Sequence, residues 1–140
     1  MHPLCALRDS GGANQGQFAQ LLAESVIFHS PLLVRSVEGR QKVSRVFAAY
    51  SSAWSGRYVR QEKLDSHTSF TYWSGSVRGH AIESLEIIVD DDSGLVAEQT
   101  TAYRPFPAII SVRREAYEAL KDILGPEYWS YTPGDLPTLP

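Results

Sequence analysis

The chain has 140 residues and a mass of 15.6 kDa, with 43% hydrophobic and 21% charged residues, which is the size of one globular domain and too short for two independent cores. Its net charge is −3 and its 13 lysines and arginines form no run, so we expect no nucleic-acid partner, because binding the phosphate backbone needs a basic stripe. Without a long apolar run or a signal-peptide pattern, we expect a cytoplasmic protein that does not enter the membrane.

Cysteine and histidine usage argues against a metal or a redox group. The single cysteine, Cys5, excludes an internal disulfide, a thiolate zinc site and an iron–sulfur cluster, since each needs several sulfurs. The four histidines have no short ligand spacing, although His67 lies two residues after Asp65. We therefore expect no metal and no cofactor.

The first half of the chain predicts two helices and a strand. Asn14 and Gln17 have the spacing of a capping box and begin a short helix over residues 14–24. The β-branched residues that follow predict a strand ending near Ser30, because the next residue is a proline. After Gly39, a helix over residues 40–54 carries one apolar stripe, formed by Val43, Val46, Phe47, Tyr50 and Trp54.

The second half predicts four strands and a further helix. The strands are expected at roughly 58–65, 67–77, 80–90 and 95–104, and the helix runs from Ile109 to Ile123 before Gly125-Pro126 stops it. Residues 1–125 then form a single domain, followed by a proline- and aromatic-rich tail at 126–140. Helices first and antiparallel strands later indicate an α+β domain in which a curved sheet wraps around the helices. The same order excludes a doubly wound nucleotide-binding sheet.

Three segments occur in this order: FHSP at 28–31, EGRQKVSRVF at 38–47 and DSGLVAEQTTAYRP at 92–105. With the initial HPL, they resemble the nuclear transport factor 2-like superfamily, specifically its SnoaL-like (polyketide cyclase-like) branch, over about residues 2–124. The resemblance implies a cone-shaped α+β fold whose curved antiparallel sheet encloses an apolar cavity for small hydrophobic molecules. Function does not follow from it, because this fold hosts isomerases, dehydratases, cyclases and non-catalytic binding proteins.

In ketosteroid isomerase, a member of this superfamily, the general base is an aspartate directly before the proline of the first strand. Ser30 stands at that position, nine residues before Gly39. A hydroxyl cannot replace a carboxylate in abstracting a carbon-bound proton, so we expect no steroid isomerisation by that mechanism. Ser30 is then either a hydrogen-bond donor in the cavity or a cap for the bend before Pro31. Its neighbour His29 points to the opposite face, at the surface or an interface.

Strand 80–90 offers two faces to the interior. One carries Ala81, Glu83, Leu85, Ile87 and Val89, and the other carries Ile82, Ser84, Glu86 and Ile88. The first is more apolar, which predicts Glu83 inside the cavity as a desolvated proton shuttle, or else at its rim in a salt bridge. Counted back from Gly94 without a gap, Glu86 takes the position of the isomerase's second acid; a one-residue gap in the long DDDSG turn puts Leu85 there. We adopt the gapped register because it keeps the apolar face inside.

The family register also selects residues on the neighbouring strands. It points Phe70, Tyr72 and Ser74 inward on strand 67–77, and Gln99, Thr101 and Tyr103 inward on the last strand. Arg104 has the opposite parity to Tyr103, which favours a structural ion pair at the sheet edge. The predicted catalytic residues are Glu83, Tyr72 and Tyr103, and the predicted ligand contacts are Ser30, Trp54, Phe70, Ser74, Leu85, Ile87, Gln99 and Thr101.

Two functions fit these residues. The first is a cofactor-independent enzyme of the cyclase, isomerase or dehydratase type, acting on a hydrophobic polyketide- or terpenoid-like substrate. The second is a non-catalytic module that binds a small ligand in the same cavity. Ser30 in place of an acid favours the second function, whereas the polar groups predicted inside favour the first, which we adopt. Because family members usually pair through the convex sheet face, and Trp73, Ile82 and Ile88 are assigned to that face, we also expect a homodimer.

Overall fold

The computed structural model describes residues 1–131. Within this range no helix is long and apolar enough to cross a membrane. The α+β class predicted from the sequence is confirmed. The elements are α1 (Pro3–Asp9), α2 (Gln15–Ala19), β1 (Leu22–His29), β2 (Val37–Glu38), α3 (Arg40–Ala53), β3 (Ser55–Lys63), β4 (Thr68–Val77), β5 (His80–Asp90), β6 (Val96–Arg104), α4 (Phe106–Leu120) and the 3-10 helix η1 (Pro126–Tyr128).

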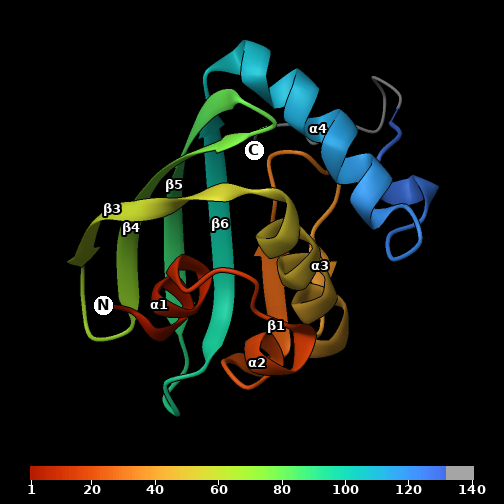
Figure 1. Ribbon diagram of the computed structural model, residues 1–140. Coiled ribbons are helices and arrows are strands. Elements are labelled where there is room, and N and C mark those ends of the chain that lie inside the picture. The colour runs from red at the N-terminus through yellow and green to blue at the C-terminus, as the bar shows by residue number, and fades with distance from the viewer. Residues whose placement is uncertain (132–140) are drawn as a thin grey trace, which may run out of the picture.

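One six-stranded sheet, in the order β2-β1-β6-β5-β4-β3, forms the body of the molecule. Its strands pair antiparallel except β1 and β6, which run parallel. After β1, the strands β3 to β6 form an antiparallel meander, and its last strand, β6, lies beside β1. The parallel β1–β6 pair is therefore joined by a long crossover connection. The sheet curves, and α1, α2 and α3 lie across its concave side (Figure 1).

Helix α3 forms almost as its apolar stripe predicts. Gly39 is its N-cap with φ 93°, a conformation that glycine adopts without strain. The stripe residues Val43, Val46 and Phe47 are fully buried. The Phe47 ring meets the Phe28 ring of β1 edge-on at 5.0 Å, so the helix and the sheet share one aromatic core.

The N-terminal helices differ from the prediction in length. The capping box of Asn14 and Gln17 is present, but α2 ends at Ala19 instead of residue 24, because Leu22 already begins β1 and pairs with Val96 of β6. Before it, α1 is a seven-residue helix whose N-cap is His2. The His2 ring lies at the end of β5, with its Nε2 at 3.0 and 3.1 Å from the two carboxylate oxygens of Asp90.

The C-terminal segment that the structure describes packs onto the domain. Trp129 is buried, and its indole N–H donates to the Leu124 carbonyl at 3.2 Å. Arg113 of α4 donates to the carbonyls of Leu32 and Trp129. The beginning of the predicted tail is thus fixed against α4, and residues 132–140 lie outside the described residues.

Candidate functional site

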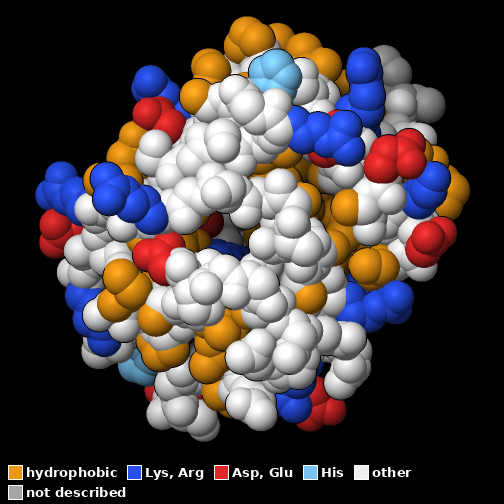
Figure 2. Space-filling model, viewed as in Figure 1, with side chains coloured by type: hydrophobic (Ala, Val, Ile, Leu, Met, Phe, Trp, Pro, Cys, Tyr) orange, Lys and Arg blue, Asp and Glu red, His pale blue; other side chains and the backbone are white. Residues whose placement is uncertain are grey.

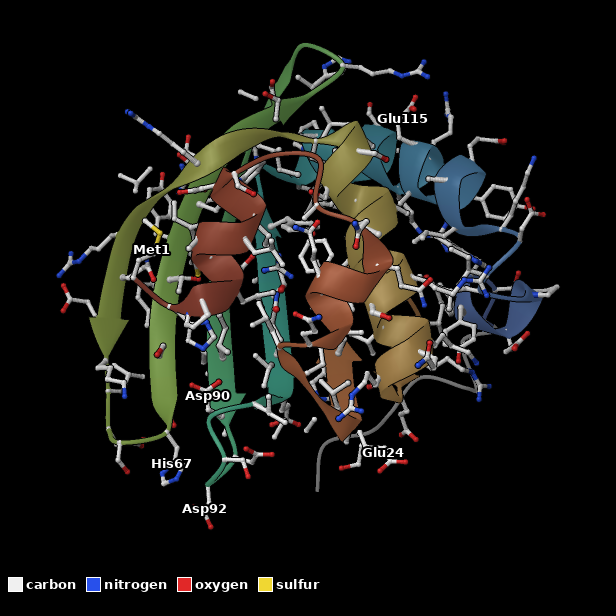
Figure 3. All side chains as sticks on the ribbon, turned by 60° about the horizontal axis from the view of Figure 1, so that its bottom comes forward. Met1, Glu24, His67, Asp90, Asp92 and Glu115 are labelled. Carbon is white, nitrogen blue, oxygen red and sulfur yellow. The ribbon has the colours of Figure 1, made fainter. Side chains whose placement is uncertain are left out.

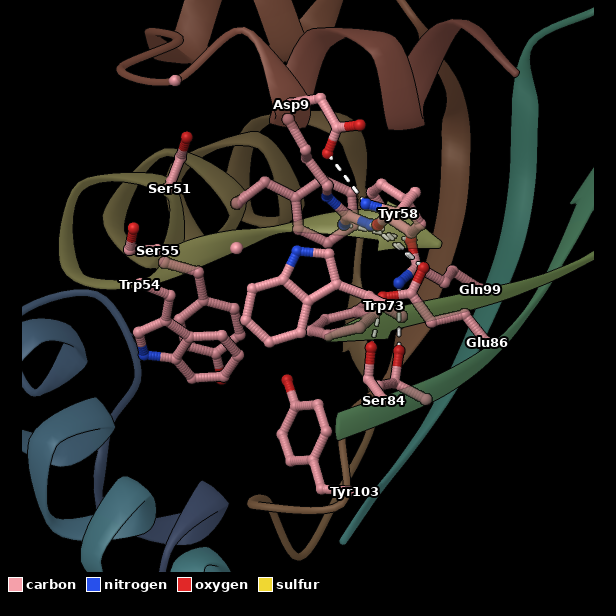
Figure 4. A pocket seen from close by; sticks show the side chains of 17 residues that line it. Asp9, Ser51, Trp54, Ser55, Tyr58, Trp73, Ser84, Glu86, Gln99 and Tyr103 are labelled. Atoms are coloured by element: carbon pink, nitrogen blue, oxygen red, sulfur yellow. Dashed lines mark hydrogen bonds and ion pairs between the residues drawn. The ribbon is translucent and has the colours of Figure 1, made fainter. Parts of the chain in front are cut away.

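A cavity of about 230 Å³ lies between the concave face of the sheet and the helices α1 and α3. It opens near the middle of the face shown in Figure 2. Aromatic rings from α3 and the strands form most of its wall, and charged and amide side chains from α1, β5 and β6 form its deep end (Figure 4). Such a mixture of apolar wall and few polar groups is typical of small-molecule sites.

Strand register brings the polar lining together in two rows. One row crosses four strands and contains Tyr58, Trp73, Ser84 and Tyr103, which are paired in that order. In the next row Glu86 of β5 is paired with Thr101 of β6. Because alternate strand residues share a face, the residues of these two rows all lie on the concave face of the sheet.

Glu86 is the carboxylate at the deep end of the pocket, and its two oxygens have different surroundings. Oε2 accepts hydrogen bonds from the Tyr58 hydroxyl at 2.9 Å and the Thr71 hydroxyl at 3.0 Å, with the Arg8 guanidinium at 3.4 Å. Oε1 accepts one long bond, from the Ser84 hydroxyl at 3.3 Å. The side chain is 7% exposed, and Oε1 is therefore the oxygen with free capacity to accept a proton or a hydrogen bond.

Arg8 ties α1 to the pocket. Its guanidinium donates to the Tyr58 hydroxyl at 2.8 Å and to the Gln99 side-chain oxygen at 3.1 Å, and it lies 4.4 Å from the centre of the Phe47 ring. Gln99 in turn donates to the Thr101 hydroxyl at 3.0 Å. The cation thus fixes an amide and a phenol in one orientation beside Glu86. The sequence prediction missed Arg8, because a short N-terminal helix gives no signal that it closes over a sheet.

Two phenols in the pocket have unused hydrogen-bonding capacity. The Tyr50 hydroxyl is buried and has no hydrogen-bond partner among residues 1–131. The Tyr103 hydroxyl points into the pocket (Figure 4). Burial raises the pKa of Tyr50 to about 12 and holds the pKa of Tyr103 well above its ordinary value, so both phenols keep their protons near neutral pH. Tyr103, whose hydroxyl points into the pocket, can donate its proton to a ligand oxygen.

Two glycines shape the wall beside Trp73. Gly56 of β3 and Gly75 of β4 are paired, and the Trp73 ring lies across them. A Cβ at either glycine would come within 2.3 Å of the Trp73 ring. The missing side chains therefore let this indole lie against the sheet and leave the space in front of it open.

Comparison with solved structures shows the fold alone. No protein-family model and no curated protein match the chain. An uncharacterised protein with a cystatin-like fold from Silicibacter pomeroyi is 21% identical, with a TM-score of 0.77 over 86% of each chain. A steroid delta-isomerase from Pseudomonas aeruginosa is also 21% identical, with a TM-score of 0.74 over 86% of each chain. A nuclear transport factor 2-like protein of unknown function from Burkholderia xenovorans is 15% identical, with a TM-score of 0.62 over 74% of this chain and 80% of that one.

The chain adopts the nuclear transport factor 2-like fold. In this nuclear transport factor 2-like cone, the predicted facing of β5 is wrong. Leu85 and Ile87 are 41% and 45% exposed on the outer face, and Glu83 lies there as well, with its carboxylate 2.6 Å from Arg104 and accepting from Tyr72 at 2.7 Å. The ungapped register is therefore correct, and Glu86 is the acid inside.

The facing of β4 that the family register predicted is also wrong. Ser69, Thr71 and Trp73 are buried on the inner face, which places Phe70, Tyr72 and Ser74 on the outer one. Trp73, Ile82 and Ile88, predicted on the convex face, are instead buried inside. Ser30 does not line the pocket either; its hydroxyl accepts from the Leu32 N–H at 3.2 Å and caps the bend.

Four of the predicted site residues do line the cavity. They are Trp54, Gln99, Thr101 and Tyr103. Trp54 follows α3 and stacks on Tyr50 with ring centres 4.5 Å apart, and the Tyr103 ring meets it edge-on at 5.4 Å. Their contact with a ligand stays a prediction. Among residues 1–131, no group of three His, Cys, Asp or Glu side chains is arranged to hold a metal ion.

Proposed function

We propose that the chain is a cofactor-independent enzyme that moves a proton within a small hydrophobic molecule bearing an oxygen, in a reaction of the isomerase, cyclase or dehydratase type. The observation that carries the proposal is a buried carboxylate, Glu86, and a phenol, Tyr103, that line the same aromatic pocket. A polyketide- or terpenoid-like compound has the apolar surface to fill such a pocket and the carbonyl or hydroxyl oxygen to engage this phenol.

Glu86 takes the role that the sequence assigned to Glu83. Its Oε1 removes a proton from a carbon next to the substrate carbonyl and returns that proton to a second carbon, so the carboxylate ends the cycle as it began. Tyr58, Thr71 and Arg8 hold Oε2, which keeps Oε1 in one position. A fixed base near a bound substrate lowers the barrier by avoiding the entropy loss of a collision.

Tyr103 takes the role of the polarising group. When the proton leaves the carbon, negative charge develops on the carbonyl oxygen, and a neutral phenol donor in a water-poor pocket stabilises that charge. The raised pKa of Tyr103 keeps it protonated for this purpose. Tyr72, predicted for this role, lies on the outer face of the sheet, where its hydroxyl donates to Glu83.

The test is hydrogen exchange in D₂O with a panel of hydrophobic ketones that differ in ring number and in the position of unsaturation. Trp54 and Trp73 line the pocket, so tryptophan fluorescence reports binding while proton NMR follows the loss of carbon-bound protons. We expect at least one ketone both to change the fluorescence and to exchange at least about 100-fold faster than in buffer. Binding with no exchange of any bound ketone would overturn the proposal.

The second candidate function is a non-catalytic module that holds a small apolar ligand. It is favoured by the engaged state of Glu86 Oε2 and by Ser30, whose hydroxyl caps a bend where ketosteroid isomerase places its base. The same experiment separates the two functions. A binding module changes tryptophan fluorescence with a saturable profile and leaves the exchange rate at the value of buffer.

We also propose a homodimer through the outer face of the sheet, on different residues from those the sequence suggested. Leu85 and Ile87 are exposed there, beside Tyr72 and Phe70 on the paired strand. These four side chains form one apolar patch on β4 and β5. Large apolar side chains left in water on the outer face of a sheet are typical of a surface that pairs.

A further inference from the structure

A second polar cluster lies on the outer face, where β1 ends beside β6, and plays no part in the pocket. His29 is the last residue of β1. Its Nδ1 lies 2.6 Å from the Ser36 hydroxyl, in the loop before β2, and its Nε2 lies 2.9 Å from Glu98 Oε2 of β6. Phe28 and Gln99, the neighbours of His29 and Glu98, line the pocket, so the cluster faces the other way.

The order of these contacts is that of a nucleophile, a base and a carboxylate that orients the base. A carboxylate only accepts hydrogen bonds, so Glu98 favours the imidazole tautomer with its proton on Nε2. Nδ1 is then the acceptor for the Ser36 hydroxyl. We propose that Ser36, His29 and Glu98 form a nucleophilic site that takes an acyl group from small activated esters and hydrolyses it.

The reaction balances with water as the co-reactant. Ser36 Oγ attacks the ester carbonyl carbon while its proton passes to His29 Nδ1. The bond to the leaving oxygen breaks, and the leaving alcohol takes that proton, which leaves an acyl ester on Ser36. A water molecule, deprotonated by His29, then attacks this ester; the acid departs and Ser36 regains its proton.

The surroundings favour small esters with good leaving groups. The His29 and Glu98 side chains are 38% and 46% exposed, so a reagent reaches the site from solvent without entering a cavity. An open site has little binding energy for an unactivated substrate, so the reagent must carry a good leaving group. Aryl acetates and fluorophosphonates carry one.

The chain contains its own matched control. Ser66 and His67 make the same contact at 2.8 Å, and His67 Nε2 lies 2.9 Å from Asp92. Here, however, the serine and histidine are adjacent at a turn and the Asp92 side chain is 100% exposed at a second turn (Figure 3). A fully exposed carboxylate gains little from such a pair and does not hold the imidazole in place, so we expect Ser66 to be unreactive.

The experiment labels the full chain with a fluorophosphonate and maps the adduct by tandem mass spectrometry. It is run on the natural chain and on Ile87→Lys, so that pairing through the outer sheet face does not cover the cluster. We expect labelling of Ser36 at least about 100-fold faster than labelling of Ser66. We also expect His29→Gln to slow it about 100-fold, and Ser66→Ala to leave it unchanged. Equal labelling of the two serines, labelling that survives His29→Gln, or no adduct on Ser36 would each overturn the proposal.

Glu98 acts as a positioning residue, because it touches His29 and not the ester. In Glu98→Ala we expect Ser36 labelling to slow about 10-fold. We also expect the nitrogen-15 NMR shifts of His29 to change from the single Nε2–H tautomer to a mixture of both. A slower reaction with the tautomer unchanged would contradict the positioning role.

Discussion

The Tyr58 hydroxyl donates to Glu86 Oε2 at 2.9 Å, although Tyr58 lies on β3 and Glu86 on β5, with β4 between them. Thr71, on the intervening strand, donates to the same oxygen at 3.0 Å. Three consecutive strands therefore converge on one carboxylate oxygen at the deep end of the pocket. This convergence fixes Glu86, whose other oxygen accepts one long hydrogen bond, from Ser84 at 3.3 Å.

The hydrogen bond from Tyr58 to Glu86 should contribute to the stability of the fold. Tyr58→Phe removes one donor from a buried carboxylate and one acceptor from Arg8, so we expect the free energy of unfolding in urea to fall by about 1–3 kcal/mol. Tyr72→Phe is the matched control, because it removes a similar bond to Glu83 on the outer face and should lower the free energy of unfolding less than Tyr58→Phe does. Equal losses would mean that the Glu86 cluster is not a buried network.

The paired glycines Gly56 and Gly75 should be needed for the packing of Trp73 in the pocket wall. In Gly75→Ala the new Cβ would meet the Ser55 carbonyl oxygen and the Trp73 ring, both at 2.3 Å. We expect a loss of about 1–3 kcal/mol in unfolding free energy, and tryptophan fluorescence shifted to longer wavelength as the indole moves. Gly16→Ala in α2, where the nearest atom is 3.4 Å away, should leave stability unchanged or raise it by up to about 1 kcal/mol. An unshifted spectrum in Gly75→Ala would contradict the packing of Trp73.

The buried Cys5 thiol should make the stability of the fold depend on pH in the alkaline range. Burial raises the pKa of Cys5 from 9.0 to about 12. Below pH 9 both folded and unfolded chains keep the proton; between pH 9 and 12 only the unfolded chain loses it, so this group lowers the free energy of unfolding by about 1.4 kcal/mol per pH unit. The slope for Cys5→Ala should be shallower by that amount. Parallel slopes for the two proteins would show that the thiol is not buried in solution.

If the apolar patch on β4 and β5 pairs two chains, the protein should be a dimer in solution. Sedimentation at micromolar concentration should give twice the 15.6 kDa chain mass, and Ile87→Lys should give the monomer, because it places a charge in the patch of Phe70, Tyr72, Leu85 and Ile87. Val59→Lys is the control, since Val59 is exposed on β3 outside the patch. A monomer in the natural chain, or dissociation by both changes, would contradict the proposed interface.

Local signals in the sequence were enough to predict most of the fold. The capping box at Asn14 and the stripe of α3 depend on neighbours a few residues away, and such patterns survive folding. The parallel pairing of β1 with β6 and the closure of α1 over the pocket were not predicted, because both depend on contacts between distant segments.

The facing of β5 was predicted incorrectly because the site itself breaks the hydrophobic pattern. The inner face of β5 carries Ser84 and Glu86 to line a pocket, while the outer face carries Leu85 and Ile87. A rule that turns the more apolar face inward selects the wrong face where a polar site lies inside and an apolar patch lies outside. Counting back from Gly94 without a gap was the signal that would have found Glu86.

The most direct test of Glu86 as the proton acceptor compares Glu86→Gln with Glu83→Gln in the D₂O exchange assay. The two changes are chemically identical, lie three residues apart on β5, and differ in the face of the sheet. We expect Glu86→Gln to slow exchange of the responsive ketone at least about 100-fold, and Glu83→Gln to change it less than about twofold. Full activity in Glu86→Gln, or an equal loss in both variants, would contradict the assignment of Glu86 as the proton acceptor.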